Sequence, residues 1–133
     1  MATRWFANRK LALGIGLSAI SLVISACGNE APKAPPGLLI ESPQARQAGG
    51  ALFENNCAIC HGVNGDGQGP RQEGMNPPPA NLTLPPWSDP GSAGKVFLVI
   101  RHGVRGTAMP AWPAFSDEQV WDLVAYIVSL KHQ

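Results

Sequence analysis

The chain has 133 residues, of which 44% are hydrophobic and only 14% are charged, and its formal net charge at pH 7 is +1. This length allows one domain of modest size, and the near-neutral charge gives no support for nucleic-acid binding, which requires a basic surface. Fifteen glycines and thirteen prolines predict that loops make up much of that domain.

Residues 1–26 are predicted to form a signal peptide. Three basic residues lie within the first ten, and an uncharged apolar run follows over residues 11–24. This run is too short for a typical transmembrane helix and suits the hydrophobic region of an export signal. A tilted membrane anchor is the alternative. Removal of this segment would leave seven basic and nine acidic residues, a net charge of −2.

The segment Ile24-Ser25-Ala26-Cys27 resembles the lipobox of bacterial lipoproteins. The resemblance implies cleavage before Cys27, a lipid on its thiol and a bacterial protein anchored on the periplasmic side of a membrane. Gly28, in place of Asp, resembles lipoproteins that are passed on to the outer membrane. Ordinary cleavage that leaves Cys27 as a free thiol is the alternative. Residues 27–43, rich in proline, would then form an extended tether.

A helix is predicted from Pro43 or Gln44 to Asn56, with Ser42 as its N-cap. It leads into Cys57-Ala58-Ile59-Cys60-His61, which has the C-x-x-C-H spacing of c-type haem attachment. Two such thiols can form thioethers with the vinyl groups of one porphyrin, and the histidine can then bind the iron.

Two other uses of this cysteine pair are less consistent with the sequence. A thioredoxin-like redox pair needs a βαβ context, which the surrounding residues do not predict. A zinc site needs further ligands at suitable spacing, and no second cysteine pair exists. Assignment of Cys57 and Cys60 to haem leaves an odd third cysteine, which lipidation of Cys27 would explain.

Three segments together resemble the class I, single-haem cytochromes c. They are Phe53–Gly62, the run Gly65-Asp-Gly-Gln-Gly-Pro, and Thr107-Ala-Met-Pro-Ala-Trp; the resemblance extends over roughly residues 44–131. It implies a domain at 44–133 with an all-α fold, in which three or four short helices and long loops surround one covalent haem c. It also implies that Gly49 and Phe53 lie where the first helix crosses residues 123–126 of the last.

The loops between the helices supply further candidate residues. The run after His61 contains four glycines, but no strand precedes it and no Lys-Ser/Thr follows, so it does not predict a phosphate-binding loop. The resemblance implies that a proline carbonyl in this run accepts a hydrogen bond from His61, and Pro70 is the candidate. Leu82 and Trp87 are expected to line the haem pocket; Trp87 could instead donate its indole N–H to a propionate.

Two more helices are predicted, over Ala93 to Arg101 or His102 and from Ser116 to about Lys131. Gly103 lies where the first should end. Ser116 and Gln119 form a capping-box pattern at the start of the second. Its apolar residues recur at spacings of three and four, which predicts a buried face.

Met109 is the candidate second axial ligand, because it lies between these two helices, where the family places its methionine. A thioether ligand raises the haem potential relative to a second imidazole. One alternative is that Met109 only fills space in the core. Met75 is the other candidate methionine. His102 as the second ligand would give a bis-histidine haem. His102 also suits a helix C-terminus as a cationic residue.

An iron with both axial positions filled by the protein has no site for a substrate, and the rest of the sequence offers no recognisable set of catalytic residues. We therefore expect a membrane-tethered one-electron carrier, and neither an enzyme nor a nucleic-acid-binding protein. Its partners would be redox proteins, either a donor dehydrogenase or an acceptor reductase or oxidase. The alternatives are an electron-accepting subunit of a larger oxidoreductase and a gas-sensing haem with a displaceable Met109. Lys95, Arg101 and Arg105 could steer an acidic partner or only solvate a face.

Overall fold

The structure, a computed structural model, describes residues 31–34 and 40–130. The predicted signal peptide, Cys27 and most of the tether lie outside these residues. The described elements are α1 (Pro43–Asn56), α2 (Ala58–His61), the 3₁₀ turn η1 (Pro90–Ser92), α3 (Ala93–His102) and α4 (Asp117–Ser129). No strand occurs among the described residues, so the all-α prediction is confirmed. Within the same residues, no helix has the length and apolar character needed to cross a membrane.

The starts of α1 and α4 are set by local capping, as predicted. The Oγ atom of Ser42 accepts a hydrogen bond from the Ala45 N–H at 3.3 Å, and Pro43 occupies the first turn of α1. At α4, Ser116 Oγ accepts from the Gln119 N–H at 3.2 Å, and Gln119 Oε1 accepts from the Ser116 N–H at 2.9 Å. This reciprocal pair satisfies two backbone donors that the first turn would leave without partners.

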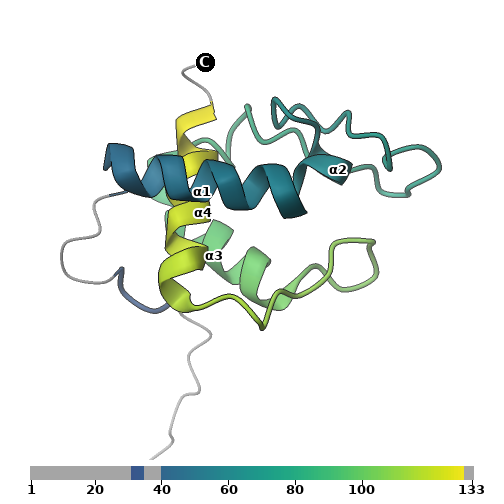
Figure 1. The fold of residues 1–133 in the computed structure, drawn as a ribbon. Helices are drawn as coiled ribbons and strands as arrows, with labels where there is room; N and C mark the ends of the chain where they lie inside the picture. Colours follow the sequence, from purple (N-terminus) through teal and green to yellow (C-terminus); the bar gives the residue numbers. More distant parts are fainter. Residues whose placement is uncertain (1–30, 35–39, 131–133) are drawn as a thin grey trace, which may run out of the picture.

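Helix α1 crosses α4, and this crossing lies at the centre of the fold (Figure 1). Gly49 lies against the backbone of Asp122 and Leu123, and the rings of Phe53 and Tyr126 are 5.1 Å apart. The predicted crossing of the first and last helices is confirmed, and the contact begins one residue earlier, at Asp122. A glycine is needed here because any side chain would overlap the α4 backbone.

Helix α4 also supplies the largest share of the core. Its apolar face is buried as predicted, and α3 packs against it. The rings of Phe97 in α3 and Trp121 in α4 lie 4.8 Å apart. The buried α4 residues are Val120, Trp121, Leu123, Val124, Ala125, Ile127 and Val128.

Two long loops extend from these helices on the side where α2 lies (Figure 1). The first, residues 62–89, follows α2 and contains six of the thirteen prolines. The second, residues 103–116, joins α3 to α4 and is called here the Met109 loop. The helices thus form the core on one side, and the loops on the other side surround the candidate site.

Candidate haem site

A cavity of about 390 Å³ lies between the two loops and helices α1, α3 and α4. This volume is in the range of sites that bury a small organic ligand. Most of its wall is apolar, with contributions from Phe53, Val96, Ile100 and Ile127. Six of the seven predicted haem-site residues line it: Cys57, Cys60, His61, Leu82, Trp87 and Met109.

The two thiols and the imidazole are brought together by a single helical turn. Cys57 is the C-cap of α1 and the N-cap of α2, and its carbonyl accepts from the N–H groups of Cys60 at 3.1 Å and His61 at 2.9 Å. Residues three and four apart on a helix share one face. The C-x-x-C-H spacing therefore directs all three side chains to the same cavity.

The Cys57 thiol does not have the pKa of a catalytic redox cysteine. Burial, and to a lesser extent the neighbouring Cys60, raises the pKa of the Cys57 thiol to about 11. Reactive cysteines of thiol–disulfide enzymes have lowered pKa values, since the thiolate is the nucleophile. The raised pKa of Cys57 therefore argues against the thioredoxin-like alternative.

His61 is oriented by a backbone carbonyl. Its Nδ1 lies 3.0 Å from the carbonyl oxygen of Ala80, so Nδ1–H donates this hydrogen bond and Nε2 is the nitrogen left for a metal. Burial lowers the pKa of His61, and the hydrogen bond to Ala80 opposes this effect in part. The imidazole is thus favoured in the neutral form that binds metal ions.

The prediction that Pro70 supplies this carbonyl was wrong. Pro70 is exposed and does not line the cavity. The loop after His61 folds back on α2 instead, because the Gly67 N–H donates to the His61 carbonyl at 2.7 Å. The Leu82 N–H donates to the Gly65 carbonyl at 2.7 Å, which draws the segment containing Ala80 towards the imidazole.

Met109 lines the cavity from the other loop. The Met109 carbonyl accepts from the Val104 N–H at 3.1 Å, and the Met109 N–H donates to Thr107 Oγ1 at 3.1 Å. The Thr107 hydroxyl in turn donates to the Val104 carbonyl at 2.8 Å. Gly103, with φ of +68°, allows the close turn, because a Cβ there would lie 2.7 Å from the Met109 carbonyl oxygen.

The alternative axial ligands are placed differently. Met75 also lines the cavity, so position alone does not separate the two methionines. His102 is exposed in the last turn of α3 and does not line the cavity, which removes support from the bis-histidine alternative.

The two predicted wall residues of the first loop differ in exposure. Leu82 is buried, whereas Trp87 is half-buried with the Lys95 Nζ 5.4 Å from its ring centroid. Sequence reasoning missed Trp112, which lines the cavity and stacks on Phe115 with ring centroids 5.2 Å apart. The sequence signal that could have identified Trp112 is its position three residues after Met109.

Residues 44–127 match the protein family described as cytochrome c oxidase, cbb3-type, subunit III. The chain belongs to this family. Its domain is accordingly a class I c-type cytochrome domain, as the sequence resemblance implied, and membership implies covalently bound haem c. The residues that line the cavity fit that cofactor, because two thiols, an imidazole and two thioethers occur in a mostly apolar wall.

Curated relatives of this cytochrome domain include two oxidase subunits. The chain is 36% identical over 98 residues to the cbb3-type cytochrome c oxidase subunit FixP of Azorhizobium caulinodans, covering 73% of this chain and 30% of that protein. It is 34% identical over 97 residues to subunit CcoP of Rubrivivax gelatinosus, covering 72% and 29%. The chain thus spans about 30% of the length of these relatives.

Two solved structures resemble the cytochrome domain. A chain of the Kuenenia stuttgartiensis reducing HAO-like protein complex is 30% identical with a TM-score of 0.61, over 74% of this chain and 50% of that one. Cytochrome cL of Methylophaga aminisulfidivorans is 21% identical with a TM-score of 0.51, over 69% and 57%. The second likeness concerns the fold alone, and it agrees with the predicted cytochrome c fold.

Proposed function

We propose that this chain is a one-electron carrier that holds a single haem c, with His61 and Met109 as axial ligands, and that works on the periplasmic side of a bacterial membrane. The observation that carries the proposal is the meeting of three features at one cavity: the two thiols, the oriented imidazole and the Met109 loop. The sequence contains one C-x-x-C-H motif, which supports a single haem.

The residues around the cavity have complementary tasks in this proposal. When bound, haem c supplies an iron that alternates between Fe(III) and Fe(II). Cys57 and Cys60 would hold the porphyrin covalently, and His61 would offer Nε2 to the metal with its tautomer fixed by Ala80. Met109 would offer a neutral, soft sulfur, which favours the reduced state and raises the potential.

The tether supports a membrane-bound carrier. A lipid on Cys27 would anchor the chain, and each buried CH₂ of an acyl group contributes about 0.8 kcal/mol. The proline-rich residues 28–43 would then act as a semi-rigid spacer that gives the domain reach towards its redox partners. An outer-membrane destination, suggested by Gly28, belongs to the same proposal.

Carbon monoxide binding to the purified reduced protein tests the axial ligation. If both axial positions are held by the protein, the visible spectrum should not change when carbon monoxide is added. Ready binding would show an open or labile position and would favour a gas-sensing haem.

A second candidate function is an electron-accepting subunit of a larger oxidoreductase, favoured by the relatives that are named as oxidase subunits. Purification of the tagged chain from detergent-solubilised membranes separates the two. The carrier proposal expects the chain to elute alone at moderate salt. Constant, stoichiometric recovery with a catalytic subunit would establish the alternative.

A further inference from the structure

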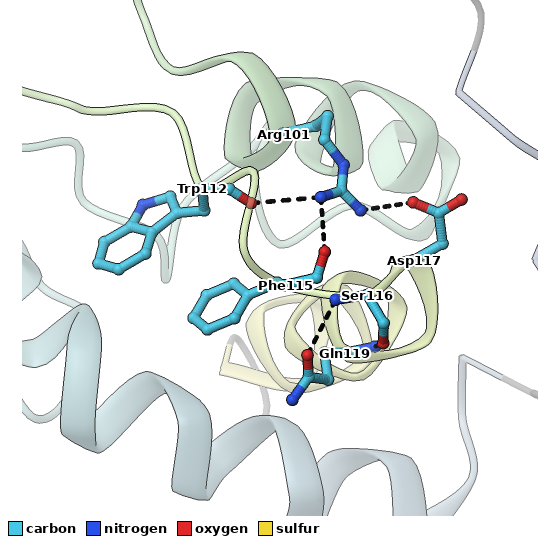
Figure 2. Close-up of polar contacts among 6 residues, drawn as sticks. All are labelled: Arg101, Trp112, Phe115, Ser116, Asp117 and Gln119. Carbon is cyan, nitrogen blue, oxygen red and sulfur yellow. Dashed lines mark hydrogen bonds and ion pairs between the residues drawn. The ribbon is translucent and has the colours of Figure 1, made fainter.

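The Arg101 side chain joins three segments of the fold (Figure 2). It extends from the last turn of α3, and its Nη1 donates to the carbonyl oxygens of Trp112 at 3.2 Å and Phe115 at 2.7 Å. Its Nη2 forms an ion pair with Asp117 in the first turn of α4. The guanidinium also lies 5.6 Å from the centre of the Phe97 ring. One side chain therefore fastens the end of the Met109 loop to both neighbouring helices.

The hydrogen bonds that Arg101 donates to the two carbonyls belong to a strong class. Its side chain is only 18% exposed, so the two bonds to carbonyls form in partly desolvated surroundings. Hydrogen bonds from an ionised donor are shorter and stronger than neutral ones. The planar guanidinium presents several N–H groups in a fixed fork, a geometry that a lysine ammonium does not have. These engagements also argue against Arg101 as a freely exposed residue that steers a partner.

The segment that Arg101 holds adjoins Met109. Trp112 follows Met109 by three residues, lines the same cavity and stacks on Phe115. Arg101 binds the carbonyls of both members of this stacked pair. Phe115 directly precedes Ser116, the N-cap of α4, so the stretch from the cavity wall to the helix start is fixed as a unit (Figure 2).

The remaining hydrogen bonds of the Met109 loop include some within the loop and some to the helices. Those among Val104, Thr107 and Met109 lie within the loop itself and do not connect it to the core. The Trp112 N–H donates to the Ile100 carbonyl at 3.2 Å, which is a backbone link to α3. Besides the capping box of Ser116 and Gln119, the Arg101 fork supplies the side-chain hydrogen bonds between this loop and the helices.

We infer that Arg101 is a positioning residue for Met109: by clamping the Met109 loop it sets how readily an outside ligand displaces the Met109 sulfur from the iron. The inference deepens the proposed function and rests on ligation by Met109. A looser loop would let the sulfur move away more often, while the haem stays attached through Cys57 and Cys60.

The exchange rate of the sixth ligand tests this role. The ferric, haem-loaded full chain is mixed with saturating imidazole, and loss of the near-infrared sulfur-to-iron band is followed by stopped flow. Loss of two charge-assisted hydrogen bonds should speed exchange at least about tenfold in Arg101→Gln. Arg101→Lys keeps the charge beside Asp117 but loses the fork, and we expect a rise of about threefold.

Two control variants separate the clamp from charge alone. Arg105→Gln removes an exposed arginine of the same loop, and Asp117→Asn removes the 60% exposed partner of the ion pair. Both should exchange within about twofold of the wild-type rate, because exposed ion pairs contribute little. If Arg101→Gln does not incorporate haem, Arg101→Lys decides the question.

The outcomes distinguish the role inferred for Arg101 from the proposed ligation by Met109, on which it rests. Wild-type exchange rates in both Arg101 variants, with the band present, would overturn the clamp and leave Met109 ligation intact. A lower urea midpoint with an unchanged exchange rate would show a merely structural role and would also overturn it. Absence of the sulfur-to-iron band from the wild-type protein would overturn both.

Discussion

Gly49 of α1 lies directly against the backbone carbonyl of Asp122 in α4. A Cβ at this position would overlap that carbonyl and would lie 3.0 Å from the Leu123 nitrogen, so the helices would have to separate. We predict that Gly49→Ala lowers the free energy of unfolding by about 1–3 kcal/mol, the usual cost of overpacking. Guanidinium denaturation of the haem-loaded protein measures it.

Gly50→Ala is the matched control for this substitution. A Cβ at Gly50 would meet only the Tyr126 ring, at 3.2 Å, and a side chain can shift by a few tenths of an ångström. The better helix propensity of alanine, worth about 1 kcal/mol, should offset that shift. Equal stability of Gly49→Ala and Gly50→Ala would contradict the close crossing.

Replacement of the two cysteines that we propose to hold the haem should remove the cooperative fold. The domain has about 90 residues, a size at which the core alone rarely supplies enough stability. In Cys57→Ser/Cys60→Ser the cavity would lose the cofactor that joins α1, α3 and the two loops. We expect a largely unfolded chain by circular dichroism, and a cooperative thermal transition in this variant would refute the prediction.

Met109→Ala should open one axial position. We expect loss of the sulfur-to-iron band, carbon monoxide binding in the reduced state and a lower reduction potential, because the soft thioether favours Fe(II). Met75→Leu is the control, since Met75 lines the same cavity from the other loop. Spectra that change with Met75→Leu and not with Met109→Ala would reverse the ligand assignment.

Asp122→Asn should stabilise the fold at neutral pH. Burial, followed by the nearby Glu118, raises the pKa of Asp122 above its usual range. The folded state therefore holds this proton more tightly than the unfolded chain does, and stability falls as the pH rises through the window above about 3.8. The gain in melting temperature from Asp122→Asn should be present at pH 7 and vanish at pH 3; a gain that persists at pH 3 would exclude this cause.

Cys27→Ser tests the lipid anchor without touching the haem cavity. The variant should appear in the soluble periplasmic fraction and retain the wild-type visible spectrum. Immunoblots of fractionated cells measure the distribution. Continued recovery in the membrane fraction would favour the uncleaved, tilted anchor over lipidation.

The elements of this fold were predictable where the cause is local. The start of α4 follows from Ser116 and Gln119, and the end of α3 from Gly103, because capping depends on residues a few positions apart. The C-x-x-C-H spacing similarly places three side chains on one helical face. The crossing at Gly49 came from the family resemblance and from the cost of a glycine inside a helix.

The parts that escaped prediction depend on contacts between distant segments. No local pattern tells which carbonyl of a proline-rich loop will face His61, and the loop brings Ala80, not Pro70, to that position. The fork from Arg101 to the Trp112 and Phe115 carbonyls spans eleven and fourteen residues. A sequence shows that Arg101 is charged, but the folded loop decides whether that charge meets solvent or backbone.

The apolar wall of the cavity also has a kinetic consequence for electron transfer. Side chains such as Val96, Ile100 and Ile127 carry no dipoles that could reorient when a unit of charge appears or disappears beside them. Beside a bound haem, the polarisation of these side chains would therefore change little between the two oxidation states. This apolar wall would favour a small reorganisation energy, and with it a low barrier for electron exchange even when donor and acceptor differ little in potential.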